Sequence, residues 1–259
     1  MLPAYTSDQI RDAEAGPLAA GEPLMTTAAY ALATAVAREL TSRGYRVSGS
    51  EITVFAGGGN NGGDGLYAAA YLARRGASVV VFPVSENVHA GGLAAAIHAG
   101  ARVLPASATV PEVALRSGVW VDAILGIGYR GPLRVRECRV LNQLVGAQDA
   151  APDEPIVVAA DIPSGVGADD ASVAGPVLRA TRTVTFGGAT PGLLVPPGAE
   201  YVGVLEVIDL GLELTGADLG LVGDSDAADM IIVPGPTDHK YSRGVVQVHA
   251  GSVLSLIHI

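Results

Sequence analysis

The chain has 259 residues, and its 26 acidic against 16 basic side chains give a net charge of −10. This charge argues against binding to nucleic acids or anionic membranes, although backbone amides can still hold a small phosphate-bearing ligand. The single cysteine, Cys138, excludes an internal disulfide and indicates a reducing, cytoplasmic setting. The N-terminus lacks the layout of a signal peptide and no apolar run could cross a bilayer, so we expect a soluble protein.

Two helices are predicted first in chain order. Thr6 or Ser7 can cap the first, and apolar residues at helical spacing from Met25 to Leu40 predict a second that ends at Gly44. Apolar runs then alternate with helical patterns. The strand candidates are residues 52–56, 78–83, 101–104, 119–125, 156–160, 181–186 and 204–208, and the helix candidates between them include 65–75, 91–98 and 134–145. This alternation predicts a three-layer α/β/α Rossmann-like domain with a mostly parallel sheet and ligands at the carboxyl ends of the strands.

The Asp- and Gly-rich residues 214–229 predict a domain boundary, and we expect one domain over residues 1–225 and the start of another over 226–259. Residues 230–233 and 245–248 are interpreted as short strands. Because a strand needs neighbours for its hydrogen bonds, the chain is expected to be truncated. Its last residues, about 253–259, are suspected to be non-native sequence.

The run GGGNNGGDG, which starts at Gly57, lies between the first strand candidate and a helical pattern. A strand that turns through glycines into a helix leaves backbone N–H groups free for a phosphate, although the glycine spacing alone is a weak signal. Asn60, Asn61 and Asp64 add side-chain oxygens to this turn. They indicate that a cation or a hydroxylated ligand also binds there.

Two further strand ends carry oxygen-bearing side chains, namely Asp122 on one run and Asp161 with Ser164 after another. Each Asp taken alone caps a turn about as often as it serves a site. Three such places at one edge of a sheet favour ligand binding. An amide, a carboxylate and a hydroxyl suit a hard cation, and an alkali ion better than zinc.

Three further residues are weaker candidates for a role in the site. His89 and His98 flank a helical pattern and are predicted to be surface or packing residues, since neither has an orienting partner in the sequence. Arg130, in the glycine loop after Asp122, is placed to reach a phosphate.

Taken together, GGGNNGGDG, DAILGIGYRG and DIPSG resemble the NAD(P)H-hydrate epimerase family, also called the YjeF N-terminal domain, over about residues 5–212. Further on, DHKYSRGV at 238–245 resembles the opening of the ADP-dependent NAD(P)H-hydrate dehydratase. That ribokinase-like domain follows the epimerase in many bacterial bifunctional repair enzymes. Its catalytic and nucleotide sites would lie beyond Ile259, so we do not expect dehydration from this chain.

The resemblance implies that the chain interconverts the R and S epimers of hydrated NADH or NADPH, which carries a hydroxyl on C6 of the nicotinamide ring. A partner dehydratase that takes only the S form then repairs both. It also implies a potassium ion with Asn61, Asp122 and Ser164 as side-chain ligands. The implied substrate contacts are Asn60, Asn61, Gly62, Gly63, Asp64, Gly126, Ile127, Gly128, Tyr129, Arg130, Gly131, Pro132 and Asp161.

Asp161 is our candidate acid and base in this reaction, because loss and return of the C6 hydroxyl each need a proton transfer. One departure from the family concerns Thr190, which precedes Pro-Gly-Leu-Leu where many relatives have a lysine.

Two alternatives remain open at this point. An NAD-dependent oxidoreductase would place an acidic residue at the end of the second strand, where Glu86 is poorly positioned. A non-enzymatic scaffold of the same fold, with an N-terminal helix pair that supports a homodimer, would not need carboxylates at strand ends. The sequence does not decide the oligomeric state or the preference between the NADH and NADPH hydrates.

Overall fold

The structure is a computed structural model that describes residues 1–217, 219–231, 233–242 and 244–247. The chain divides into two compact units, one from Leu2 to Leu221 and one made of Met1 with the residues from Val222 onward. The first unit carries the sheet and the candidate site. Among the described residues no helix combines the length and apolar character needed to cross a membrane. The predicted division at residues 225 and 226 stays a prediction.

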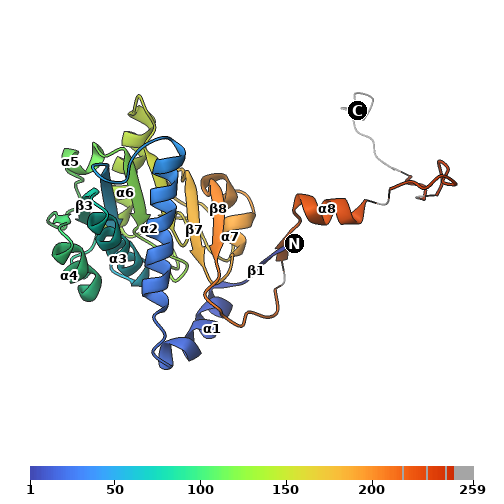
Figure 1. The fold of residues 1–259 in the computed structure, drawn as a ribbon, viewed down its shortest axis with the longest axis horizontal. Coiled ribbons are helices and arrows are strands. Elements are labelled where there is room, and N and C mark those ends of the chain that lie inside the picture. Colours follow the sequence, from blue (N-terminus) through green and yellow to red (C-terminus); the bar gives the residue numbers. More distant parts are fainter. Residues whose placement is uncertain (218, 232, 243, 248–259) are drawn as a thin grey trace. The chain divides into compact units, whose positions relative to one another are not determined.

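Seven parallel strands form the central sheet of the first unit, in the order β4-β3-β2-β5-β6-β7-β8 (Figure 1). Their bounds are β2 Glu51–Ala56, β3 Ser78–Pro83, β4 Arg102–Val103, β5 Val119–Ala123, β6 Ile156–Ala160, β7 Arg182–Phe186 and β8 Val204–Ile208. Every residue of β5 and β6 is buried, which explains why both read as continuous apolar runs. The predicted α/β class with a parallel sheet is confirmed.

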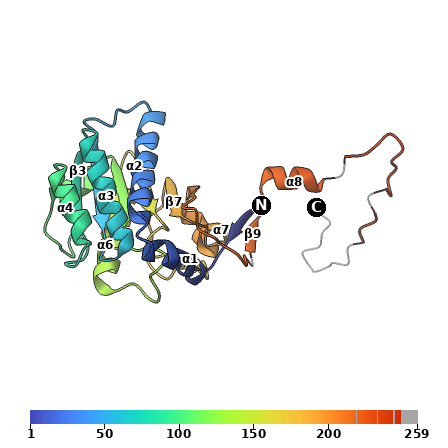
Figure 2. The same cartoon turned by 60° about the horizontal axis from the view of Figure 1, so that its bottom comes forward.

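Helices cover both faces of this sheet (Figure 2). Their bounds are α1 Ser7–Ala19, α2 Leu24–Ser42, α3 Asn60–Arg74, α4 Ala90–His98, α5 Glu112–Leu115, α6 Val135–Ala150 and α7 Pro191–Leu194, with a 3-10 turn at Gly198–Tyr201. Helices α2, α3 and α4 pack on one face, where Leu32 and Leu66 join the first apolar cluster. Helices α5 and α6 pack on the other, where Trp120, Phe55 and Leu141 join the second.

The strand order reverses direction between β2 and β5, because the chain runs from β2 to one edge and returns beside β2 to build the other half. In doubly wound sheets ligands bind at the carboxyl ends of the strands at such a switch point. Helix α3 begins there. It starts at Asn60, five residues before the predicted helix, since the glycines that suggested a loop let the helix pack closely: a Cβ on Gly62 would lie 2.1 Å from the Gly57 carbonyl oxygen.

Thr6 caps α1 in a capping box with Gln9, as one of the two predicted caps. A small antiparallel sheet of β1 (Leu2–Ala4) and β9 (Leu219–Leu221) was not predicted, because three residues are too few to show a period.

The two short strands predicted near the end of the chain are wrong in the described residues. Met230 ends a helix, α8 (Asp224–Met230), which Asp226 caps at Gly223, and neither Ile231 nor Val233 belongs to a strand. Residues 245–247 also form no strand, since no described strand pairs with them. Val248 and residues 253–259, with the prediction that the latter are non-native, lie outside the described residues.

Candidate active site

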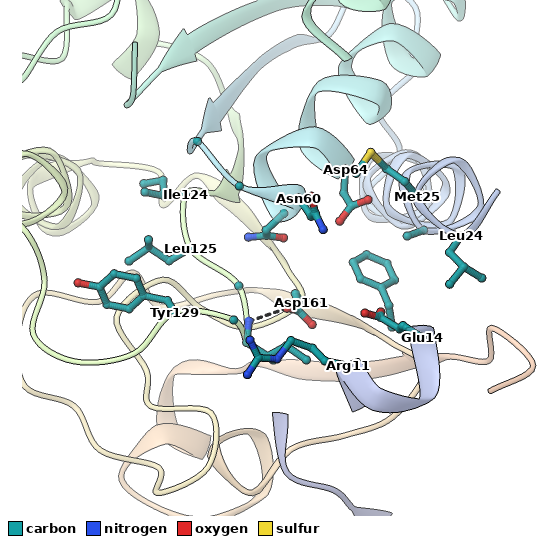
Figure 3. A pocket seen from close by; sticks show the side chains of 18 of the residues that line it. Arg11, Glu14, Leu24, Met25, Asn60, Asp64, Ile124, Leu125, Tyr129 and Asp161 are labelled. Atoms are coloured by element: carbon teal, nitrogen blue, oxygen red, sulfur yellow. Dashed lines mark hydrogen bonds between the residues drawn. The ribbon is translucent and has the colours of Figure 1, made fainter. Parts of the chain in front are cut away.

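A cavity of about 650 Å³ opens at the carboxyl ends of the central strands, around the N-terminus of α3 (Figure 3). Its volume is in the usual range for a small-molecule site. Its lining comes mainly from α1, the starts of α3 and α6, and the loops that follow β3, β5 and β6. The lining includes Arg11, Glu14, Asn60, Asn61, Asp64, Ser85, Asn87, Gly126, Ile127, Gly128, Tyr129, Arg134, Glu137 and Asp161.

The first turn of α3 presents backbone donors to this cavity. Its N-cap is Gly59, which has no side chain to accept from the N–H groups of that turn. The helix dipole adds positive potential at the same end. Asn60 and Asn61 both line the cavity, so the start of α3 is suited to an anionic group.

Asp161 follows β6 and is held in an unusual conformation. Its φ of +68° lies in the left-handed region that residues other than glycine rarely adopt. Its Oδ2 accepts the Ile127 N–H at 2.7 Å, and its Oδ1 lies 3.4 Å from the Thr185 hydroxyl, which donates to it. Burial, assisted by the negative charge of Glu14, raises the pKa of Asp161 to about 6 against these two hydrogen bonds. The carboxyl therefore titrates close to neutral pH.

Two more carboxyl groups face the same space as Asp161 (Figure 3). Burial raises the pKa of Asp64 well above its ordinary value, and the nearby charges of Asp161 and Glu14 raise it further. The pKa of Glu14 is also raised by burial, against the opposing effect of Arg11. Three coupled carboxyl groups in one cavity do not all ionise easily, so at least one favours its protonated form.

Gly126 lies between Asp161 and Asn61 in the lining of the cavity. A Cβ on this residue would lie 2.7 Å from Asp161 Oδ2 and 2.9 Å from Asn61 Cβ. Only a residue without a side chain leaves both in place. The glycine loop after β5, the start of α3 and the end of β6 therefore meet at this point.

Asp122 and Ser164 form a fully buried pair beneath the loop. The Ser164 hydroxyl donates to Asp122 Oδ1 at 2.6 Å, and the Ser164 N–H donates to Oδ2 at 2.9 Å. The Leu125 N–H in turn donates to Ser164 Oγ at 2.9 Å. Burial raises the pKa of Asp122, and the hydrogen bonds from Ser164 and Ile124 oppose this.

Asn61 is the third residue that the family resemblance implied as a potassium ligand. Its Oδ1 and Nδ2 are both buried and have no hydrogen-bond partner among the described residues. Asn61 adjoins Gly126, and Ser164 links the buried Asp122 carboxylate to Leu125 of the same loop, so an amide oxygen, a hydroxyl and a carboxylate come from elements that meet this loop. This set fits an alkali cation, whose charge would offset the burial of Asp122.

Not every residue implied as a substrate contact lines the cavity. Asn60, Asn61, Asp64, Gly126, Ile127, Gly128, Tyr129 and Asp161 do, whereas Gly62, Gly63, Arg130, Gly131 and Pro132 are absent from its lining. The Arg130 guanidinium is instead engaged with Asp8, Asp169 and Ser7.

Two other residues that the sequence singled out lie outside the cavity lining. Thr190 is fully buried at the N-cap of α7 and does not line the cavity. His89 Nδ1 caps α4 by accepting the Gly92 N–H, in line with its predicted packing role.

Sequence reasoning missed two acidic residues of the lining, Glu14 and Glu137. Glu14 lies inside α1, which is far from the other site residues in the chain, and Glu137 lies in a helix in which charged side chains are common. No local pattern sets either apart. A carboxylate near the start of a helix is the one weak signal, and only for Glu137.

The fold and cavity define a doubly wound α/β protein with its ligand pocket at the switch point. The family model described as "YjeF-related protein N-terminus" matches residues 21–192. The chain therefore belongs to this family.

Curated relatives agree with this assignment. The bifunctional NAD(P)H-hydrate repair enzyme Nnr of Mycobacterium tuberculosis is 40% identical over 252 residues, covering 96% of this chain and 50% of the relative. The NAD(P)H-hydrate epimerase of Clavibacter sepedonicus is 43% identical over 224 residues, covering 82% of this chain and 92% of the relative. The chain thus spans about half the length of the bifunctional relative and nearly all of the epimerase.

A solved structure shows the same fold. The crystal structure of yeast ynu0 has a TM-score of 0.67 and 21% identity, and the match covers 95% of this chain and 100% of that one.

Proposed function

We propose that this chain interconverts the R and S epimers of hydrated NADH and NADPH. The observation that carries the proposal is Asp161, a buried carboxyl group with a pKa of about 6 that lines a cavity beside a free helix N-terminus. The similarity to a relative named NAD(P)H-hydrate epimerase, of which the chain covers 92%, supports the same reaction.

Asp161 acts as the acid and then as the base. In its protonated form it gives its proton to the C6 hydroxyl, which leaves as water, and the ring nitrogen lone pair stabilises the resulting iminium. Water returns from either face, and the Asp161 carboxylate takes the proton that this water loses. A pKa near neutrality keeps both protonation states populated, which suits a group that must serve in both directions.

The rest of the dinucleotide binds to backbone groups. The first turn of α3 and the loop at Gly126, Ile127 and Gly128 hold the pyrophosphate and ribose, because free N–H groups suit phosphate oxygens. The elevated pKa of Asp64 favours a neutral carboxyl group beside the substrate, which can then donate a hydrogen bond.

Asn61, Asp122 and Ser164 would hold a potassium ion, and the orphaned Asn61 amide is the feature of this structure that supports it. When bound, the ion supplies positive charge that offsets Asp122 and favours the anionic dinucleotide.

The wider setting belongs to the proposal as well. The similarity to the bifunctional repair enzyme extends over 96% of the chain, against 82% for the epimerase, which supports residues from about 226 onward as the start of a fused dehydratase domain. The substrate is then shared with that domain. The single free cysteine supports a cytoplasmic location. A homodimer stays a prediction.

Chromatography of the separated epimers of hydrated NADH tests the proposal. With protein, the R and S forms equilibrate faster than the spontaneous rate, and absorbance shows no oxidation or reduction. A redox change with an alcohol substrate, or equilibration at the spontaneous rate alone, would count against it.

A further inference from the structure

Glu137 is a buried carboxylate that the proposed reaction does not use. It lies in the first turn of α6, is 9% exposed and lines the cavity. Its Oε2 is buried without a hydrogen-bond partner in the described part of the chain, and its Oε1 lies 3.8 Å from Arg134 Nη1, too far for a hydrogen bond. An unpaired buried acceptor is costly, so a carboxylate kept in this position calls for a donor from the cavity.

The start of α6, which carries Glu137, lies beside the loop after β3, because Arg136 pairs with Glu86 of that loop at 3.0 Å. Ser85 and Asn87 of the same loop approach the glycine turn: a Cβ on Gly58 would lie 2.8 Å from the Asn87 carbonyl oxygen and 3.0 Å from Ser85 Oγ. Asp161 follows β6, and β2 and β5 lie between β3 and β6 in the sheet.

A dinucleotide has a fixed order along its length, and this order decides which half meets Glu137. With the nicotinamide at Asp161 and the pyrophosphate at the N-terminus of α3, as the proposed function requires, the adenosine half extends toward Glu137. We propose that Glu137 accepts hydrogen bonds from the hydroxyls of the adenosine ribose, and that the site therefore prefers hydrated NADH to hydrated NADPH.

The chemistry follows from the carboxylate. Both oxygens of a carboxylate accept hydrogen bonds. Rotation about the last side-chain torsion costs little energy, so Oε2, which has no partner among the described residues, can turn toward a donor in the cavity. A ribose with free 2′- and 3′-hydroxyls offers two donors. A 2′-phosphate removes one donor and places further negative charge beside Glu137.

Arg134 bears on the predicted preference between the two hydrates. Its side chain is 77% exposed, lines the cavity and lies close to Glu137. An arginine in this position suits a phosphate, and the Glu137 charge opposes that use. Removing the charge leaves Arg134 available to a 2′-phosphate, so the preference should shift toward hydrated NADPH.

Glu86 offers a matched control. It follows β3, but it lies past the strand end at which an ordinary dinucleotide-binding domain has the acidic residue that holds the ribose. Its side chain is 74% exposed, pairs with Arg136 and does not line the cavity. Glu86→Gln should therefore leave the discrimination between the two hydrates unchanged.

The test compares kcat and KM of Glu137→Gln, Glu86→Gln and the unsubstituted protein for both hydrates. For Glu137→Gln we expect KM for hydrated NADH to rise about tenfold or more, in keeping with loss of a hydrogen bond to a charged group. The ratio of kcat/KM for NADH hydrate over NADPH hydrate should fall by the same factor. An unchanged ratio would overturn the assignment of Glu137.

A second measurement needs no substituted protein. ADP-ribose should compete with hydrated NADH more strongly than ADP-ribose 2′-phosphate does, and equal competition would also overturn the assignment. Calorimetry with ADP-ribose separates this inference from the proposed function. If ADP-ribose binds more weakly to Glu137→Gln and the unsubstituted protein shows no epimerisation, the ribose site is supported and the proposed reaction is rejected.

Discussion

The Asp161 carboxylate accepts the Ile127 N–H at 2.7 Å, although 34 residues separate them in the chain. This hydrogen bond joins the end of β6 to the glycine loop after β5. It fixes the carboxyl group that we assign to proton transfer against the loop that we assign to substrate binding. Asp161, which makes this hydrogen bond, has the left-handed backbone conformation. The loop after β5 therefore helps to position this carboxyl group, and its hydrogen bond opposes the rise of the pKa that burial causes.

The elevated pKa of Asp161 predicts a stability effect with a definite sign. Its folded-state pKa of about 6 lies above the ordinary 3.8, so the folded state binds the proton more tightly and stability falls as pH rises between these values. Asp161→Asn mimics the protonated form and tolerates the left-handed conformation. It should increase the free energy of unfolding at about pH 8 by up to about 3 kcal/mol, and by little at about pH 3.

Urea unfolding of both proteins at the two pH values measures this difference. If the variant is less stable than the unsubstituted protein at the higher pH, burial of the ionised Asp161 carboxylate does not destabilise the folded state.

Gly126→Ala tests the close meeting of loop, helix and strand. The added Cβ would lie 2.7 Å from Asp161 Oδ2 and 2.9 Å from Asn61 Cβ, so one of them must move. We expect a loss of stability of about 1–3 kcal/mol, typical of overpacking, together with a large loss of epimerisation. Gly128→Ala is the matched control for stability, since a Cβ there meets nothing within 4 Å. Equal stabilities of the two variants, measured by urea unfolding, would contradict the packing at Gly126.

The proposed potassium site predicts a specific thermal response. Potassium chloride should raise the unfolding temperature more than choline chloride at the same ionic strength, because an ion that binds only the folded state stabilises it by mass action. In Asn61→Leu the buried amide is replaced by a side chain of similar size, and the specific increment should disappear. A potassium increment that survives in Asn61→Leu would remove Asn61 from the proposed ligands.

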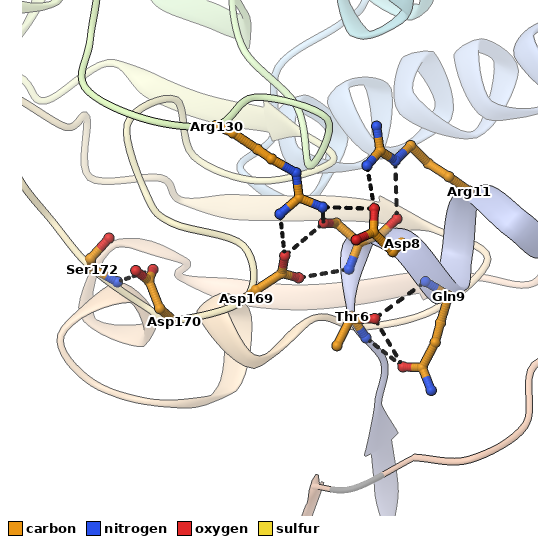
Figure 4. Close-up of polar contacts among 9 residues, drawn as sticks. Thr6, Asp8, Gln9, Arg11, Arg130, Asp169, Asp170 and Ser172 are labelled. Atoms are coloured by element: carbon orange, nitrogen blue, oxygen red, sulfur yellow. Dashed lines mark hydrogen bonds and ion pairs between the residues drawn. The ribbon is translucent and has the colours of Figure 1, made fainter.

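Helix α1 carries Glu14 into the site, and its start is anchored by Asp169 (Figure 4). Asp169 accepts the Ser7 N–H at 2.6 Å and the Ser7 hydroxyl at 2.8 Å, and Ser7 is fully buried. Arg130 reaches Asp169 at 2.9 Å, but its side chain is half exposed. Asp169→Ala should cost about 2 kcal/mol because it leaves the buried Ser7 donors unpaired, whereas Arg130→Ala should cost less than about 1 kcal/mol. Chemical denaturation of both variants measures this order, and the reverse order would contradict it.

The sheet could be predicted from the sequence because its central strands β5 and β6 are buried along their whole length and therefore appear as apolar runs. The bounds of β3, β6 and β8 were predicted as observed, although β8 is only partly buried. The structure near the end of the chain could not be predicted. Asp-rich residues suggest a loop, but they also stabilise the first turn of a helix, and the first turn of α8 contains Asp224 and Asp226.

The candidate site was predictable where a residue breaks or ends the apolar pattern of a strand. The glycine turn, Asp122, Asp161 and Ser164 stand out because they interrupt or end apolar strands. Glu14 and Glu137 lie in helices, where a carboxylate is ordinary, and their importance comes from burial against distant elements. Tertiary packing decides this, and no short-range pattern contains it.

The rate at which purified R-hydrated NADH converts to the S form, measured by chromatography with the spontaneous rate subtracted, tests the assignment of Asp161 most directly. The unsubstituted protein should accelerate this conversion, and folded Asp161→Ala should return it to the spontaneous rate. Conversion by Asp161→Ala as fast as by the unsubstituted protein would contradict the acid and base role on which the mechanism rests.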